Sequence, residues 1–193
     1  DPTMQLIISE ELDRAGVEPV DNPIGIGWAG PTLLHAGTDE QTARYLRPLL
    51  TGEEFWCQLF SEPGAGSDLA GLSTRAVLDG DEFVGTGQKV STPGAHHADW
   101  CLCYVRTDPA APKHKGISAI IIEMSSPGIT CRPLPELTEP DYADFNEVFF
   151  EDVRVPADQL VGELNGGWAI TQGSLAHERA MLWLAYSDQL ENL

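Results

Sequence analysis

The spacing of apolar residues changes twice along this chain, and these changes limit the folds it can adopt. The apolar residues of segment 3–15 recur at helical spacing, and Gly16 follows as a C-terminal stop. The segment from Thr38 to Gln41 has the sequence of a capping box, which predicts the start of a second helix that ends before Gly52. The first third of the chain is therefore predicted to be helical.

From residue 55 onward the apolar runs become short and alternate with Gly, Pro and Asp, a pattern typical of antiparallel strands. The pair Asp79-Gly80 is a tight-hairpin signal. Because strands do not alternate with helices here, the pattern predicts a barrel or a sandwich and excludes a doubly wound nucleotide-binding fold. We predict strands at residues 72–78, 82–86, 100–106, 117–123, 129–134 and 147–150.

After Gly166-Gly167 the helical spacing returns and continues to the end of the chain. The predicted fold class is therefore α+β, with N-terminal helices, an antiparallel β-barrel middle domain and the start of a C-terminal helical bundle. The corresponding boundaries are residues 1–54, 55–163 and 164–193.

The charge of the chain argues against nucleic acid as a partner. Eleven Lys and Arg residues against thirty Asp and Glu residues give a net charge of -19, which repels phosphate backbones and anionic membrane surfaces. A ligand that carries phosphates would need a local group of donors. The candidate donors are Arg75, Arg106, Lys113, His114, Lys115 and Arg179.

The four cysteines have neither the spacing of a redox motif nor that of a zinc site, so no metal site is predicted. Cys101 and Cys103 alternate within an apolar run and should share one face of a strand as small hydrophobic residues. Reduced thiols of this kind fit a cytoplasmic protein. No apolar stretch is long enough to predict a membrane span.

Residues 58–68 hold the most informative motif, because an apolar run gives way to a loop with two glycines and two serines. Gly64 and Gly66 allow neighbouring backbone N–H groups to point the same way, and the hydroxyls of Ser61 and Ser67 add donors. Such a loop can form a concave site for an anion. On composition alone, an ordinary connecting loop remains the simpler interpretation.

The complete string from Glu62 to Asp68 closely resembles a motif of the acyl-CoA dehydrogenases. In that family these regions form the end of a helical domain, a β-barrel middle domain and the first helix of a bundle. The resemblance therefore implies a core segment that is cut at both ends. Further matches occur in the family's order at residues 87–89, 98–100, 105–109, 127–129, 149–156 and 176–179.

The resemblance implies FAD as the cofactor. Gln58, Phe60 and Ser61 match the segment that lines the flavin ring, and Gly66 with Ser67 matches the contact to the flavin side chain and diphosphate.

The opposite wall of the predicted flavin site departs from the family. Ser91 stands where a flavin-stacking Trp is usual, and Pro93 stands at the following hydroxyl position. Thr92 supplies a hydroxyl one place away, so we include all three residues in the predicted flavin site. Loss of the aromatic face forfeits about 1 kcal/mol.

On the substrate side, the resemblance places Ser67 and Thr107 near the acyl-CoA. Arg179 matches an arginine that suits a ligand with several phosphates. Without the family, Arg179 would be interpreted as part of a solvated helix face.

Glu178 is the predicted catalytic base. It falls on one helical stripe with Leu175, Leu182 and Ala185, where burial would raise its pKa toward the value that a base needs near neutral pH. In part of the family the base occupies this position, and in other members it lies beyond residue 193. A structural role in an ion pair is the alternative.

The implied activity is α,β-dehydrogenation of an acyl-CoA to the trans-2-enoyl-CoA, by removal of the α-proton and transfer of the β-hydride to flavin N5. The resemblance also implies an electron-transfer flavoprotein as acceptor and a homo- or hetero-oligomer built as a dimer of dimers. The alternative is a non-catalytic partner subunit or a truncated remnant, favoured by Ser91 and Pro93. An unrelated binding domain ranks last.

Overall fold

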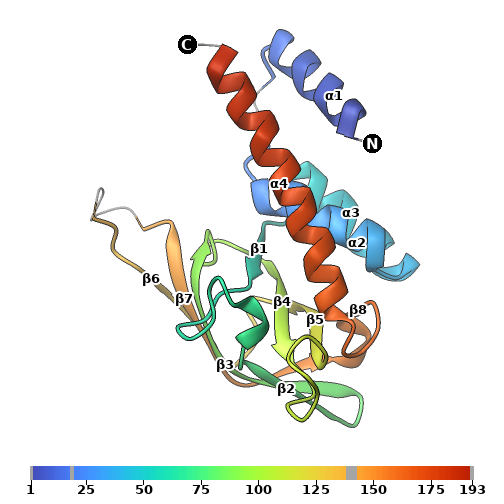
Figure 1. Cartoon of the computed structure of the whole chain (residues 1–193), viewed down its shortest axis with the longest axis vertical. Helices are drawn as coiled ribbons and strands as arrows, with labels where there is room; N and C mark the ends of the chain where they lie inside the picture. Colours follow the sequence, from blue (N-terminus) through green and yellow to red (C-terminus); the bar gives the residue numbers. More distant parts are fainter. Residues whose placement is uncertain (1, 18–19, 138–142, 192–193) are drawn as a thin grey trace.

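The computed structural model describes residues 2–17, 20–137 and 143–191, and for α4 it describes side chains as far as Arg179. The helices lie together at one end of the molecule and the strands at the other (Figure 1). The helical elements are α1 (Pro2–Arg14), the π-helix η1 (Gly25–Ala29), α2 (Gly30–Ala36), α3 (Asp39–Thr51), the 3₁₀ turns η2 (Leu69–Gly71) and η3 (Ala157–Gln159), and α4 (Gly167–Glu191). The strands are β1 (Trp56–Leu59), β2 (Arg75–Asp79), β3 (Glu82–Pro93), β4 (Trp100–Arg106), β5 (Ile117–Glu123), β6 (Ile129–Pro133), β7 (Phe145–Pro156) and β8 (Leu160–Val161).

The strands form one sheet in the order β6-β7-β3-β2-β4-β5-β8, with β1 paired to β4. Pairing is antiparallel except that β1 and β2 run parallel to β4. The predicted fold class is confirmed. β4 and β5 have the predicted bounds, whereas β3 and β7 are longer than predicted because their pairing continues past β-bulges. β1 was not among the predicted strands.

Both faces of the central strands are buried. Along β4, Cys101, Cys103 and Val105 point into a core that the sheet surrounds, while Leu102 and Tyr104 point toward the helices. The cysteine prediction is confirmed, since Cys101 and Cys103 share a buried face as free thiols. Burial raises the pKa of the Cys103 thiol to about 12, so this thiol stays protonated.

Helix α3 begins with the predicted capping box. Thr38 Oγ1 accepts a hydrogen bond from Gln41 N at 3.1 Å, and Gln41 Oε1 accepts one from Thr38 N at 3.1 Å. The helix ends at Gly52, whose φ of 71° closes the last turn. Gln41 Nε2 also donates to the carbonyl oxygens of Asp158 and Leu160, which fixes the helix to the sheet.

Buried Asn22 joins the helical layer to the sheet. Its amide nitrogen donates to the carbonyl oxygens of Leu49 (2.9 Å) and Glu54 (3.1 Å), and its Oδ1 accepts from Trp56 N at 3.1 Å. Gly25 packs directly on it, since a Cβ there would lie 2.4 Å from the Asn22 side chain. These contacts hold η1 and α2, which the sequence did not predict, against the start of β1.

We expect Gly116→Ala to lower the free energy of unfolding by more than about 1 kcal/mol. Gly116 has a φ of 92°, and an added Cβ would lie 2.3 Å from the carbonyl oxygen of Asp108. Gly80→Ala is a matched control, because Gly80 has a φ of 67° with no atom near an added Cβ. Urea unfolding of both variants checks the prediction, and equal losses would show that the contact with Asp108 is unimportant.

Candidate functional site

The segment that leaves β1 carries the first group of predicted flavin residues. Gln58 and Phe60 lie on the side of β1 that faces the helices, and the Phe60 ring packs on the Tyr104 ring with centroids 4.5 Å apart. The carbonyl oxygen of Ser61 accepts a hydrogen bond from Val90 N at 2.9 Å. The end of β1 is therefore held against β3.

A buried ion pair anchors this segment. Lys89 is fully buried, and its ammonium donates to Glu62 Oε1 (2.9 Å), to the carbonyl oxygen of Phe60 (3.1 Å) and to that of Tyr104 (2.7 Å). An ammonium has three donors, so all of them are used. The pair joins the segment after β1 to β3 and β4.

The carboxylate of Glu62 also accepts from Ser73 N (2.7 Å), Ser73 Oγ (2.8 Å) and Thr74 N (2.9 Å). Burial opposes its ionisation, but the charge of Lys89 and these hydrogen bonds lower the pKa of Glu62 to about 2. The sequence analysis gave neither member of the pair a role. The sequence did hold one indication that Lys89 is buried. Lys89 lies six residues after Phe83 on the same strand, and residues at even spacing along a strand share a face, so Lys89 shares the buried face of Phe83.

The loop after Glu62 leaves its backbone open to a ligand. Glu62 and Ala65 exchange two backbone hydrogen bonds, which fixes the turn. Gly64 and Gly66 are exposed, neither has a positive φ, and a Cβ built on either meets no atom within 4 Å. These glycines are therefore not needed for an unusual backbone conformation; their lack of a side chain leaves the backbone accessible to a ligand. Within the part of the chain that the structure describes, the amides of Gly66 and Ser67 meet no acceptor.

The second group of predicted flavin residues lies on a β-bulge. Lys89 pairs with Val148 and Thr92 pairs with Asn146, so β3 holds one extra residue between these pairs. Ser91 is exposed there with a φ of 55°, a strained value for a residue other than glycine. Thr92 points inward and is buried, and Pro93 is half-buried.

Thr107 lies at the end of β4, where it connects the sheet to the start of α4. Its hydroxyl bonds the side chains of Ser118 (2.7 Å) and Asn165 (2.6 Å). Asn165 N in turn donates to Ser118 Oγ at 2.8 Å. The predicted substrate-side hydroxyl is therefore already engaged within the chain.

Two of the candidate phosphate donors are also engaged. The guanidinium of Arg106 donates to the carbonyl oxygens of Ala70 (2.7 Å) and Lys113 (3.1 Å), which ties two loops together. The ammonium of Lys113 forms an exposed ion pair with Asp68.

Glu178 and Arg179 lie on α4, where Glu178 is half-buried and Arg179 is exposed. Neither forms an ion pair with another described residue. The side chains of Leu182 and Ala185 lie outside the described residues, so the predicted apolar stripe is described only in part. The catalytic role of Glu178 stays a prediction.

Several buried polar atoms have no hydrogen-bond partner among the residues the structure describes. Most belong to the layer between the sheet and the helices, and Gln58 and Thr92 are also predicted flavin residues. The atoms are Trp56 Nε1, Gln58 Oε1, Thr92 Oγ1, Tyr104 Oη, Ser174 Oγ and His177 Nε2. Because buried polar groups are nearly always paired, these atoms indicate where a ligand or an ordered water binds.

The described ranges hold no group of three His, Cys, Asp or Glu side chains able to bind a metal ion. None of the described helices combines the length and apolarity needed to cross a membrane.

Comparison with known proteins identifies relatives of this chain. The family model "Acyl-CoA dehydrogenase, middle domain" matches residues 57–153. The chain is 50% identical to acyl-CoA dehydrogenase FadE34 of Mycobacterium tuberculosis over 94% of its length, which is 25% of that protein. It is 42% identical to acyl-CoA dehydrogenase IpdE1 of the same organism over 95% of its length, which is 48% of that protein.

The fold agrees with solved structures. The structure described as the Tcur3481-Tcur3483 steroid ACAD matches with a TM-score of 0.82 and 41% identity, over 95% of this chain and 46% of that one. The chain thus spans between a quarter and a half of these relatives.

We expect Lys89→Met to lower the free energy of unfolding by about 3–5 kcal/mol, because it leaves the buried carboxylate of Glu62 without its counter-charge. The control Lys113→Met breaks the exposed pair with Asp68 and should change stability by less than about 1 kcal/mol. Urea unfolding of both variants is the measurement. A loss for Lys89→Met no larger than that of the control would contradict this account of the pair.

Acid should remove the stabilisation that Glu62 provides. The pKa of Glu62 is about 2 in the folded chain against an ordinary 4.5. Because the folded value is the lower one, the stabilisation is complete above about pH 4.5 and is lost as the pH falls toward 2. We expect the difference in unfolding free energy between the unaltered chain and Glu62→Gln to shrink over that range. If the difference in unfolding free energy stays constant over this pH range, the lowered pKa of Glu62 does not contribute to stability.

Proposed function

This chain belongs to the acyl-CoA dehydrogenase family, and from that premise we propose that it forms the flavin- and acyl-CoA-binding core of an enzyme that dehydrogenates acyl-CoA thioesters. In this proposal residues 1–54 end a helical domain, residues 55–163 form the middle domain, and residues 164–193 begin a C-terminal helical domain.

The observation that carries the proposal is the unpartnered atom Gln58 Oε1, which lies on the helix-facing side of β1. The bond between Ser61 and Val90 holds the end of β1 against β3. A polar cofactor on that side of β1 would satisfy Gln58 Oε1. The residues present therefore fit FAD, which when bound supplies an acceptor for two electrons.

In this arrangement Gln58, Phe60 and Ser61 would lie along the flavin ring. The exposed amides of Gly66 and Ser67 would bind the diphosphate, because backbone N–H groups without acceptors attract anions. Ser91, Thr92 and Pro93 would form the opposite wall, where Ser91 is exposed, Thr92 is buried and Pro93 is half-buried.

On the substrate side we propose Glu178 as the base that removes the α-proton of the acyl group. Its helix starts beside the sheet, where Asn165 bonds Thr107 and Ser118, so the position of α4 is fixed relative to β4 and β5. A base must be held in line with the reacting carbon to be effective. Ser67, Thr107 and exposed Arg179 would contact the acyl-CoA, with Arg179 suited to phosphate groups.

The proposal includes an electron-transfer flavoprotein as the acceptor and a homo- or hetero-oligomer built as a dimer of dimers. The similar steroid ACAD is described by two component names.

A second candidate function is that of a non-catalytic partner subunit. It is favoured by the bulge at Ser91, where an exposed small side chain stands at the predicted flavin wall and no aromatic face is supplied. Loss of that face weakens binding of a flavin ring by about 1 kcal/mol, which a partner subunit without cofactor would tolerate.

The visible spectrum of the purified full-length protein separates the two candidates. We expect stoichiometric flavin absorbance, and we expect Glu178→Gln to retain this absorbance while turnover of an acyl-CoA falls by about 10²- to 10⁴-fold. The control Glu151→Gln changes an exposed carboxylate on β7 and should leave turnover unaltered. A folded but colourless protein would support the partner-subunit function, and full turnover in Glu178→Gln would exclude this residue as the base.

A further inference from the structure

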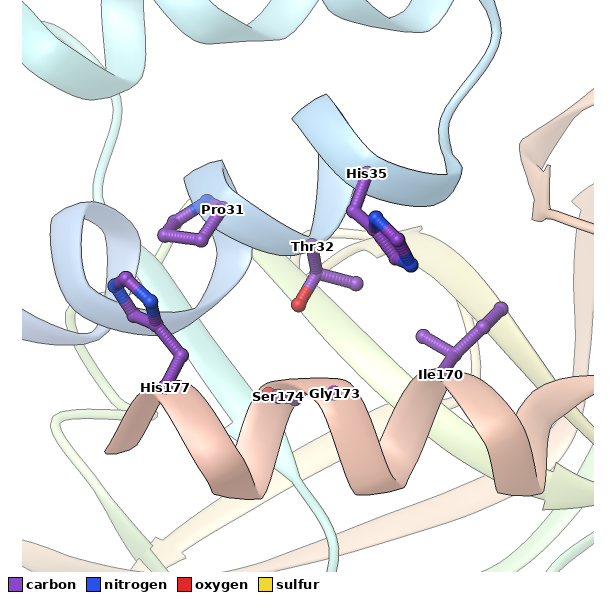
Figure 2. Close-up of a pocket in the computed structure, with 7 residues that line it drawn as sticks. All are labelled: Pro31, Thr32, His35, Ile170, Gly173, Ser174 and His177. Atoms are coloured by element: carbon purple, nitrogen blue, oxygen red, sulfur yellow. The ribbon is translucent and has the colours of Figure 1, made fainter. Parts of the chain in front are cut away.

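A cavity of about 270 Å³ lies between α2 and α4. Figure 2 shows Thr32 and His35 of α2 and His177 of α4 directed into the space between the two helices. None of the residues proposed for flavin or acyl-CoA lines it. The lining residues are Pro31, Thr32, His35, Ile170, Gly173, Ser174 and His177.

Two polar atoms of the lining have no partner among the described residues. His177 Nε2 and Ser174 Oγ are both buried, and Ser174 is only 4% exposed. Thr32 differs, since its hydroxyl already donates to the carbonyl oxygen of Trp28 at 2.7 Å. An unpaired buried polar atom costs about 1–3 kcal/mol, so two such atoms beside one cavity indicate a missing polar partner.

The Ser174 hydroxyl also lies near a second side chain. Burial raises the pKa of Tyr104, and the Ser174 side chain opposes that rise. Ser174 can therefore turn toward Tyr104 or toward the cavity, whereas His177 has no such alternative among the described residues. The unpartnered Nε2 of His177 is thus stronger evidence for a ligand in the cavity than the hydroxyl of Ser174.

The lining favours a negatively charged ligand. No carboxylate lines the cavity, although the chain holds thirty acidic residues and eleven basic ones. The polar groups of the lining are two imidazoles and two hydroxyls, and of these the imidazoles and the Ser174 hydroxyl can donate a hydrogen bond to a ligand, since Thr32 already donates to Trp28. Because the lining offers donors and holds no carboxylate, this cavity can accept an anion in an otherwise acidic chain.

The remaining walls favour a ligand with a carbon skeleton. Pro31 and Ile170 are apolar, and a Cβ built on Gly173 meets no atom within 4 Å, so open space lies above that residue. The volume is slightly below the range of about 300–1,000 Å³ that is usual for ligand pockets, which limits the ligand to a few carbon atoms.

We propose that this cavity binds the carboxylate of a small organic acid. His177 Nε2 and Ser174 Oγ donate to the carboxylate oxygens, and the carbon chain lies between Pro31 and Ile170. Inorganic phosphate shares the oxyanion but lacks the carbon chain, so it separates a carboxylic acid site from a simple anion site.

The test measures binding of butyrate, butyramide and inorganic phosphate to the full chain by isothermal titration, with the His177 ring signals followed by NMR. We expect butyrate to bind about tenfold or more tightly than either of the others, because only butyrate combines the charge with the carbon chain. Binding of butyrate should shift the His177 signals.

The variants His177→Phe and Ser174→Ala remove the donors, and Gly173→Leu fills the open space while it leaves both donors in place. Each should weaken butyrate binding by about tenfold or more. His96→Phe is the matched control, because His96 is an exposed histidine outside the cavity, and it should leave binding unchanged.

Equal affinity for butyrate and butyramide would overturn the proposal, as would butyrate binding that neither His177→Phe nor Gly173→Leu weakens. Phosphate binding as tight as that of butyrate would overturn the assignment to a carboxylic acid. No flavin and no turnover are needed, so these results do not depend on whether the chain is a dehydrogenase.

Discussion

The buried pair of Glu62 and Lys89 is the interaction on which the candidate site depends. Removing two charges from water costs desolvation free energy. Here that cost is offset because every donor of the ammonium forms a hydrogen bond, and the carboxylate also accepts hydrogen bonds from Ser73 and Thr74. The pair brings the segment after β1, strand β3 and strand β4 to one point. As a result the loop from Glu62 to Asp68 is fixed at its base while the amides of Gly66 and Ser67 meet no acceptor among the described residues, an arrangement that suits an anion-binding loop.

The layer between the sheet and the helices combines packing with unfilled hydrogen bonds. Phe60 and Tyr104 give this layer an aromatic core, yet Gln58 and Tyr104 also place polar atoms there without partners among the described residues. A core that served stability alone would not retain such atoms. Helix α4 also packs on this layer, and Asn165 fixes the start of the helix. The helix that carries Glu178 is therefore held against the sheet that includes β1, the strand of Gln58.

The two departures from the family pattern identified in the sequence, Ser91 and Pro93, lie at one wall of the proposed flavin site. The bulge turns Ser91 outward at a strained φ, while Thr92 takes the inward position. The anchoring pair and the loop after it are intact. The scaffold next to the bulge is therefore retained, and binding of a flavin at this wall is what would distinguish a catalytic subunit from a partner subunit. The cavity at His177 lies between α2 and α4, and none of the three residues at the flavin wall lines it.

Local patterns in the sequence determined the fold class, the bounds of β4 and β5, and the start of α3, because alternation and a capping box are properties of neighbouring residues. They also identified the loop beginning at Glu62. Only the tertiary structure decided that β1 pairs in parallel with β4, that Lys89 reaches Glu62 across 27 residues, and that His177 faces α2. The physical reason is that periodicity reports which face of an element is buried, whereas the partner of a buried group depends on how distant segments pack.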